Sequence, residues 1–219
     1  MDVSVFDRRE TSDQLISAPL YNLIIGLTLC WGFLANWWMV TNIDPRSIAG
    51  INPWVFFLGY FASCFAGIYL FRKSDNPLVS FIGYNLVVVP FGLVINLVVA
   101  GYNPEVVAEA VRITGFVTVG MMALGTLFPA FFARIGGALT LALLLVIVVE
   151  LVEIFIFKMH HGILDWIVAL IFCGYIGYDW GRANAIPKTV DNAIDSAAAL
   201  YIDIINLFLR ILRILGRNR

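Results

Sequence analysis

Two aspartates near the C-terminus stand inside long apolar stretches, and their positions suggest that they act together. Asp179 ends one apolar run, and Asp203 lies about three helical turns into the next. An ionisable side chain inside a membrane span is costly and therefore points to function. Two carboxyl groups that meet between adjacent antiparallel helices share a proton and titrate in coupled steps, which is the chemistry of a pH sensor. The alternative is that each aspartate packs separately against a hydroxyl or an amide.

Three other acids lie in or beside apolar runs. Glu150 and Glu153 are spaced so that they share one face of a helix. They can form ion pairs with Arg112 or Lys158, or they can line a cation pathway, since carboxylate oxygens suit a hard ion such as calcium. Both interpretations stay open. Asp165 lies near a predicted helix start, where the helix dipole favours an acid, and is expected to be an interfacial cap.

The composition places these acids in a membrane protein. The chain has 219 residues, of which 61% are hydrophobic and 13% charged, and its mean hydropathy is +0.89. Soluble domains carry about 25% charged residues, so a water-soluble globule and a disordered chain are excluded. The net charge of −1 provides no basic surface for nucleic acid. Cys30, Cys64 and Cys173 lie in apolar runs without C-x-x-C spacing and are expected to be small buried hydrophobic residues.

Seven apolar segments predict an all-α polytopic membrane protein with a single domain over residues 1–219. Continuous runs of about 20 apolar residues suit transmembrane helices, whereas a barrel requires shorter alternating segments. Residues 1–19 are expected to be a polar N-terminal segment without a cleavable signal peptide, and residues 105–112 a short interfacial helix. The predicted spans are residues 21–41, 54–71, 78–99, 113–133, 138–157, 163–180 and 193–215.

The distribution of Lys and Arg predicts that the N-terminus is inside. In this orientation three of these residues fall in outer loops, namely Arg46, Arg112 and Lys158. Seven fall in inner loops, namely Arg8, Arg9, Arg72, Lys73, Arg134, Arg182 and Lys188. Seven spans then place the C-terminus outside, although the tail is rich in arginine. Either the last helix is an exception to the rule, or it is a re-entrant or tilted segment that returns the tail to the cytoplasm.

The sequence around Asp203 resembles the closing signature of the transmembrane Bax inhibitor motif family. Residues 198–213 read AALYIDIINLFLRILR, similar to the family pattern S-L-Y-L-D-x-I-N-L-F-x-x-L-L-R, with Ala199 in place of the usual serine. Tyr178 and Asp179 resemble the Tyr-Asp pair at the end of the family's sixth helix. At the level of motifs the resemblance extends over residues 174–216, and before them it is only topological.

The resemblance implies seven helices with a central last helix, and a pH-sensitive calcium leak channel. Asp179 and Asp203 would then be the pH-sensing and gating pair and the carboxylates that meet the metal ion. Arg72, at the end of the second span, would be a latch that bridges to a carboxylate, although it also suits an ordinary boundary charge. Calcium would be the transported ion, with no cofactor. Glu150 and Glu153 match no family pattern and remain candidates for the ion pathway.

Two other classes of function compete with the channel. An intramembrane aspartyl protease of the presenilin type needs Gly-x-Gly-Asp at its second aspartate, whereas Tyr201 and Ile202 precede Asp203 here, so we predict no enzyme. The main alternative is an interaction protein that modulates cell death or a membrane protease through membrane-protein partners. Small-residue faces such as Gly136-Gly137 and the basic tail suit contacts with protein or with the lipid bilayer. The expected location is the bacterial inner membrane, with an organelle membrane as the alternative.

Overall fold

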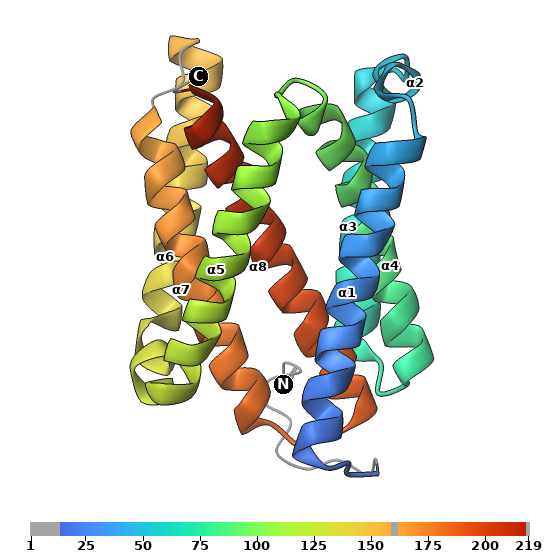
Figure 1. The fold of residues 1–219 in the computed structure, drawn as a ribbon, viewed down its shortest axis with the longest axis vertical. Coiled ribbons are helices and arrows are strands. Elements are labelled where there is room, and N and C mark those ends of the chain that lie inside the picture. Colours follow the sequence, from blue (N-terminus) through green and yellow to red (C-terminus); the bar gives the residue numbers. More distant parts are fainter. Residues whose placement is uncertain (1–13, 159–161, 218–219) are drawn as a thin grey trace. The chain divides into compact units, whose positions relative to one another are not determined.

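The protein is all-helical, as predicted, over the part of the chain that the structure describes. The computed structural model describes residues 14–158 and 162–217, so most of the predicted polar N-terminal segment lies outside the described residues. Figure 1 shows the helices, and no strand occurs among the described residues. They are α1 (Ala18–Asn42), α2 (Pro45–Ala49), α3 (Pro53–Lys73), α4 (Pro77–Val99), α5 (Pro104–Leu127), α6 (Pro129–Val152), the π-helical turn η2 (Glu153–Phe157), α7 (Gly162–Ala185) and α8 (Val190–Arg217).

Six helices within the described residues are long and apolar enough to cross a membrane. They are α1, α3, α4, α5, α6 together with η2, and α7. Large apolar side chains on these helices are exposed, among them Trp37 on α1 at 65% and Phe116 on α5 at 79%, as expected of surfaces that face lipid. The prediction of a multi-pass membrane protein is therefore confirmed. α8 has 28 residues, about 42 Å at 1.5 Å per residue, and corresponds to the predicted seventh helix, although it is more polar than the other six.

The cysteines are free, but they are not uniformly buried. Cys64 is buried, Cys173 is intermediate and Cys30 is exposed. The expectation that all three are buried was wrong for Cys30, because a membrane-spanning helix is apolar on its lipid-facing side as well as inside. An apolar neighbourhood in the sequence therefore does not distinguish the two sides of such a helix.

The predicted fourth and fifth spans differ most from the observed helices. Residues 105–112 are not a separate interfacial helix, because α5 begins at Pro104 and continues to Leu127. α6 begins at Pro129, with only Phe128 between the two helices. Proline ends the preceding helix because its ring clashes with the previous turn, and it starts the next because it lacks the N–H that a first turn leaves unbonded. Arg134, predicted as a loop charge, consequently lies within α6.

The first of two compact units contains the described residues up to Tyr102 together with Ala185–Tyr201. In this unit α3 and α4 approach each other at two glycines. A Cβ atom on Gly83 would lie 2.7 Å from the carbonyl oxygen of Gly67 and 3.0 Å from the backbone nitrogen of Phe71. Contacts this short are not tolerated, so the crossing requires residues without side chains, as is common between membrane helices.

The first part of α8 is tied into this unit by buried side-chain hydrogen bonds. Because a bilayer offers no water to polar groups, each such group needs a partner within the protein. The serine hydroxyl of α4 donates to an aspartate of α8, and an asparagine amide of α1 donates to a tyrosine hydroxyl of α8. The three contacts are Tyr21–Ser196 at 3.0 Å, Ser80–Asp191 at 2.7 Å and Asn36–Tyr201 at 2.6 Å.

Replacing Tyr201 by phenylalanine is expected to lower the free energy of unfolding only slightly, by about 0.6 kcal/mol, the average for side-chain hydrogen bonds between membrane helices. The substitution removes the hydroxyl that accepts from Asn36 and keeps the buried ring. Thermal unfolding in detergent measures the change, and Tyr69→Phe, at a tyrosine that is 64% exposed, is the control. A loss above about 2 kcal/mol would exceed the largest values found for such bonds and contradict this account.

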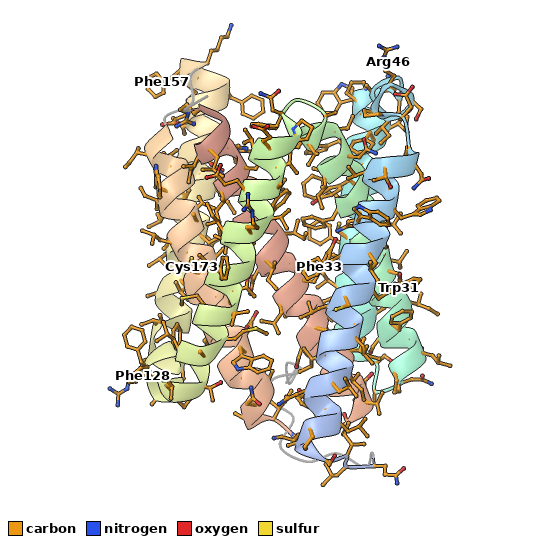
Figure 2. The ribbon with its side chains drawn as sticks, viewed as in Figure 1. Trp31, Phe33, Arg46, Phe128, Phe157 and Cys173 are labelled. Carbon is orange, nitrogen blue, oxygen red and sulfur yellow. The ribbon has the colours of Figure 1, made fainter. Side chains whose placement is uncertain are left out.

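The second unit contains Asn103–Asn184 together with the residues from Ile202 onward. In it α6 and α7 pack through glycines, since a Cβ atom on Gly174 would lie 2.7 Å from Leu139 and one on Gly136 would overlap the ring of Tyr178. Phe128 and Phe157 lie at the two ends of α6 and η2 (Figure 2). The part of α8 that belongs to this unit is largely buried, and Leu207 and Leu212 expose 1% or less.

Candidate functional site

The structure brings Asp179 and Asp203 together within the second unit. Asp179 lies near the end of α7, Asp203 lies in α8, and the two side chains form a hydrogen bond. Asp203 is buried, with 6% of its surface exposed. An ionised carboxylate can only accept hydrogen bonds, so this contact requires a proton on at least one of the two groups. The predicted juxtaposition is found, and the pH-sensing role remains a prediction.

The surroundings of this pair leave one carboxyl oxygen available. The Oδ2 atom of Asp203 is buried and has no hydrogen-bond partner among the described residues. Tyr175, one turn before Asp179, is close enough to both aspartates to interact electrostatically, while its hydroxyl donates to Thr140 at 3.0 Å. A buried carboxyl oxygen without a partner is costly. It is therefore suited to accept a proton or to contact a cation.

The third predicted gating residue, Arg72, belongs to the first unit. It lies in the last turn of α3, where its side chain is exposed. Asp179 and Asp203 belong to the second unit. The latch therefore stays a prediction.

Glu150 forms an ion pair, although not with the residues expected. Both of its carboxylate oxygens accept from the guanidinium group of Arg210: Nη1 pairs with Oε1, and Nη2 lies 3.0 Å from Oε2. Such a two-bond pair is stronger and more directional than a single contact. The predicted partners were Arg112 and Lys158, and the structure shows Arg210 instead. Glu153 lies in η2 with 9% of its surface exposed, and the ion-pathway role of both glutamates stays a prediction.

Asp165 is the centre of a buried ion-pair cluster. It is fully buried, and its oxygens lie 3.1 Å from Nη1 of Arg210, 3.6 Å from Nη1 of Arg213 and 2.8 Å from Nη2 of Arg217. Asp165 lies in the first turn of α7, as expected. The expectation that it lies at the interface was wrong, because a carboxylate can be buried when several cations replace its hydration. We call Asp165, Glu150, Arg210, Arg213 and Arg217 the Asp165 cluster.

The three arginines of this cluster were missed as functional residues. Arg210, Arg213 and Arg217 follow the spacing i, i+3, i+7, which places them on one face of α8. This signal was present in the sequence, but the arginines were counted as free charges of a tail. α8 is one unbroken helix (Figure 1), so it has no point at which a re-entrant segment could reverse. Arginines paired with buried carboxylates are also not the free loop charges to which the positive-inside rule applies.

Asp179 and Asp203 form a hydrogen-bonded pair of acids. Over residues 14–158 and 162–217 the structure contains no group of three or more His, Cys, Asp or Glu side chains placed to hold a metal ion. The predicted metal-contacting residues therefore form a pair, and a calcium ion there would need further oxygens, since calcium takes six to eight.

Comparisons with known proteins agree with the family that the motifs indicate. The model of a family described as inhibitor of apoptosis-promoting Bax1 matches residues 16–219. The chain is 32% identical to Bax inhibitor 1 of Schizosaccharomyces pombe over 171 residues, which are 76% of this chain and 63% of that protein. It is 33% identical to Protein LIFEGUARD 3 of Arabidopsis thaliana over 156 residues, 67% of this chain and 60% of that protein. An uncharacterized protein of Helicobacter pylori is 30% identical over 168 residues, 74% of this chain and 71% of that protein.

Proposed function

Because this chain belongs to the Bax inhibitor family of membrane proteins, we propose that it is a pH-sensitive calcium leak channel. The observation that carries the proposal is the buried hydrogen bond between Asp179 and Asp203. The names of these relatives do not mention calcium, and the chain covers 63% of the S. pombe protein and 60% of the Arabidopsis one. The proposal therefore rests on the site and on the resemblance of its motifs.

Loss of the shared proton adds one negative charge to the carboxyl pair. With one proton, the pair carries a single negative charge held between α7 and α8; without it, two negative charges face each other in a medium of low dielectric constant. That repulsion favours separation of the two side chains, or the arrival of a cation. The unpartnered Oδ2 of Asp203 gives calcium, as the transported ion, a first point of contact.

The remaining predicted residues have secondary parts in this proposal. Arg72 is proposed as the latch that bridges to a carboxylate and holds the pathway closed. Glu153 and Glu150 are proposed to line the ion pathway, but Glu150 can do so only when it separates from Arg210, since both of its oxygens are occupied. The proposed function involves no cofactor and no enzymatic step, and the proposed location is the bacterial inner membrane.

Calcium entry into proteoliposomes, measured from about pH 5 to pH 8, tests the proposed function. We expect the wild-type flux to change with pH, and Asp179→Asn and Asp203→Asn each to reduce that change to less than about twofold, because an amide cannot exchange the shared proton. Glu105→Gln, at an exposed acid of α5, is the matched control and should keep the wild-type profile. Wild-type flux that is absent, or constant over this range, would reject the channel.

The second candidate is an interaction protein, which the name of one relative, Bax inhibitor 1, favours. In this case membrane-protein partners carry the function, and the two aspartates only pack α7 against α8. Capture of a partner from detergent extracts that persists in Asp179→Asn and Asp203→Asn, with no calcium entry at any pH, would favour this candidate over the channel.

A further inference from the structure

We propose that the Asp165 cluster sets the register of α8 along α7 and thereby holds Asp203 opposite Asp179. The register itself follows from contacts within the second unit. Its consequence for calcium flux rests on the proposed function. Arg210 and Asp165 are on this account positioning residues, which act on the carboxyl pair through the helices that carry them.

Two of the polar contacts between α7 and α8, Asp179 with Asp203 and Asp165 with Arg217, belong to one antiparallel register. Asp165 also contacts the long side chains of Arg210 and Arg213, which reach it from earlier turns of α8. Fourteen residues separate Asp165 from Asp179 on α7 (179 − 165), and fourteen separate Asp203 from Arg217 on α8 (217 − 203). In two antiparallel helices, the residue numbers of two positions that face each other have a constant sum. This sum is 382 for both contacts (179 + 203 and 165 + 217). Fourteen residues are close to four turns at about 3.6 residues per turn, so both contacts lie on the same face of each helix.

Apart from the arginines of the Asp165 cluster, the buried surface between these contacts is apolar and cannot specify the register by itself. On α7 it contains Phe172 and Ile176, which are 7% and 0% exposed, and on α8 it contains Leu207. Apolar contacts are not directional, and between membrane helices the surrounding lipid is equally apolar, so a shift of α8 by one turn costs little there. The aligned ion pairs must therefore supply the specificity, as buried polar groups do in coiled coils.

The ion pairs of the Asp165 cluster oppose such a shift. Asp165 is fully buried and contacts three arginines spaced along α8. A shift of one turn would therefore leave an arginine near it, but it would break the two-bond ion pair between Arg210 and Glu150. The guanidinium group of Arg210 contacts Asp165 and also both oxygens of Glu150, which ties α8 to α6 as well as to α7. Arg210 follows Asp203 by seven residues, about two turns on the same face. Because α8 is one helix, contacts that hold Arg210 in place also hold Asp203 at a fixed position along α7.

Disulfide cross-linking between α7 and α8 measures this register without any flux. In a chain whose three native cysteines are replaced by alanine, Ile176→Cys is combined with Asn206→Cys, which keeps the sum of 382, or with Ile202→Cys, which lies about one turn away. The parent is expected to form the 176–206 cross-link preferentially. Arg210→Gln and Asp165→Asn should each lower that preference at least about threefold, the size of effect expected when a coupling contact is lost. Arg210→Lys should preserve part of it.

The matched control is Arg134→Gln, at an exposed arginine of α6, which should leave the cross-linking preference unchanged. If a variant does not fold, Arg217→Gln removes one of the three cations and keeps Arg210 and Arg213 on Asp165. An unchanged preference in folded Arg210→Gln, Asp165→Asn or Arg217→Gln protein would overturn the inference.

Calcium flux in the same variants separates this inference from the proposed function. The titratable groups near Asp203 are Asp179 and Tyr175 of α7, and Arg210→Gln should displace the pH profile of flux because it moves Asp203 relative to them. A lost register without any pH-dependent flux in the wild type would leave the register inference standing and reject the channel. A lost register with an unchanged pH profile would overturn the positioning role.

Discussion

The substitution Asp165→Asn is expected to lower the free energy of unfolding by about 3–5 kcal/mol, the cost of removing one partner of a buried ion pair. Asp165 is fully buried, and its oxygens face guanidinium groups of Arg210, Arg213 and Arg217. Asparagine keeps nearly the same shape but removes the charge, so three cations would remain with one fewer carboxylate to compensate them. Thermal and denaturant unfolding in detergent measure the loss.

Glu105→Gln is the matched control for this prediction. Glu105 is also an acid in the first turn of its helix, but it is exposed. Both substitutions remove an attraction to the helix dipole, which is worth about 0.3–1 kcal/mol at an exposed site. The difference between the two variants therefore isolates the ion pairs. A loss of less than about 1 kcal/mol in Asp165→Asn would mean that this aspartate is no more than a helix cap.

The substitution Gly67→Leu should destabilise the first unit by at least about 1–3 kcal/mol, the usual cost of overpacking. A Cβ atom at Gly67 would overlap the carbonyl oxygen of Gly83 and lie 3.0 Å from both Leu86 and Val87. Backbone atoms of the neighbouring helix cannot rotate away as a side chain can, so α3 and α4 would have to separate. The yield of monodisperse protein in detergent and its thermal unfolding report the effect.

Gly59→Leu provides a control on the same helix. No atom lies within 4 Å of a Cβ placed at Gly59, and an added leucine there should be neutral or slightly stabilising, since leucine is a better helix former than glycine. Equal behaviour of the two variants would show that α3 and α4 do not depend on their contact at Gly67 and Gly83.

The aspartate pair could be predicted because its information is local. The chain carries Asp179 and Asp203 in two consecutive apolar runs, and a short connection between antiparallel helices places such residues at similar heights. The starts of most spans could also be predicted. Pro53 and Pro77 begin α3 and α4, close to the predicted positions 54 and 78. Local rules of this kind do not depend on which helices pack together.

The Asp165 cluster could not be predicted fully because its partners are distant in the sequence. The spacing of Arg210, Arg213 and Arg217 identifies a charged face of α8, but nothing in that spacing says which acid it meets. Glu150 and Asp165 are 60 and 45 residues from Arg210 along the chain. Only the packing of α6, α7 and α8 brings Arg210 to these two acids. The sequence had suggested Arg112 or Lys158 as the partner of Glu150.

The single residue between α5 and α6 has a consequence for biosynthesis. With Phe128 alone separating Leu127 from Pro129, neither helix can enter the bilayer far ahead of the other, so the two insert as a hairpin. α6 has the highest mean hydropathy of the candidate spans in the described chain, while α5 has one of the two lowest. Because the hydropathy of a segment sets its tendency to insert, we expect the apolar α6 to assist the insertion of the less apolar α5 during synthesis.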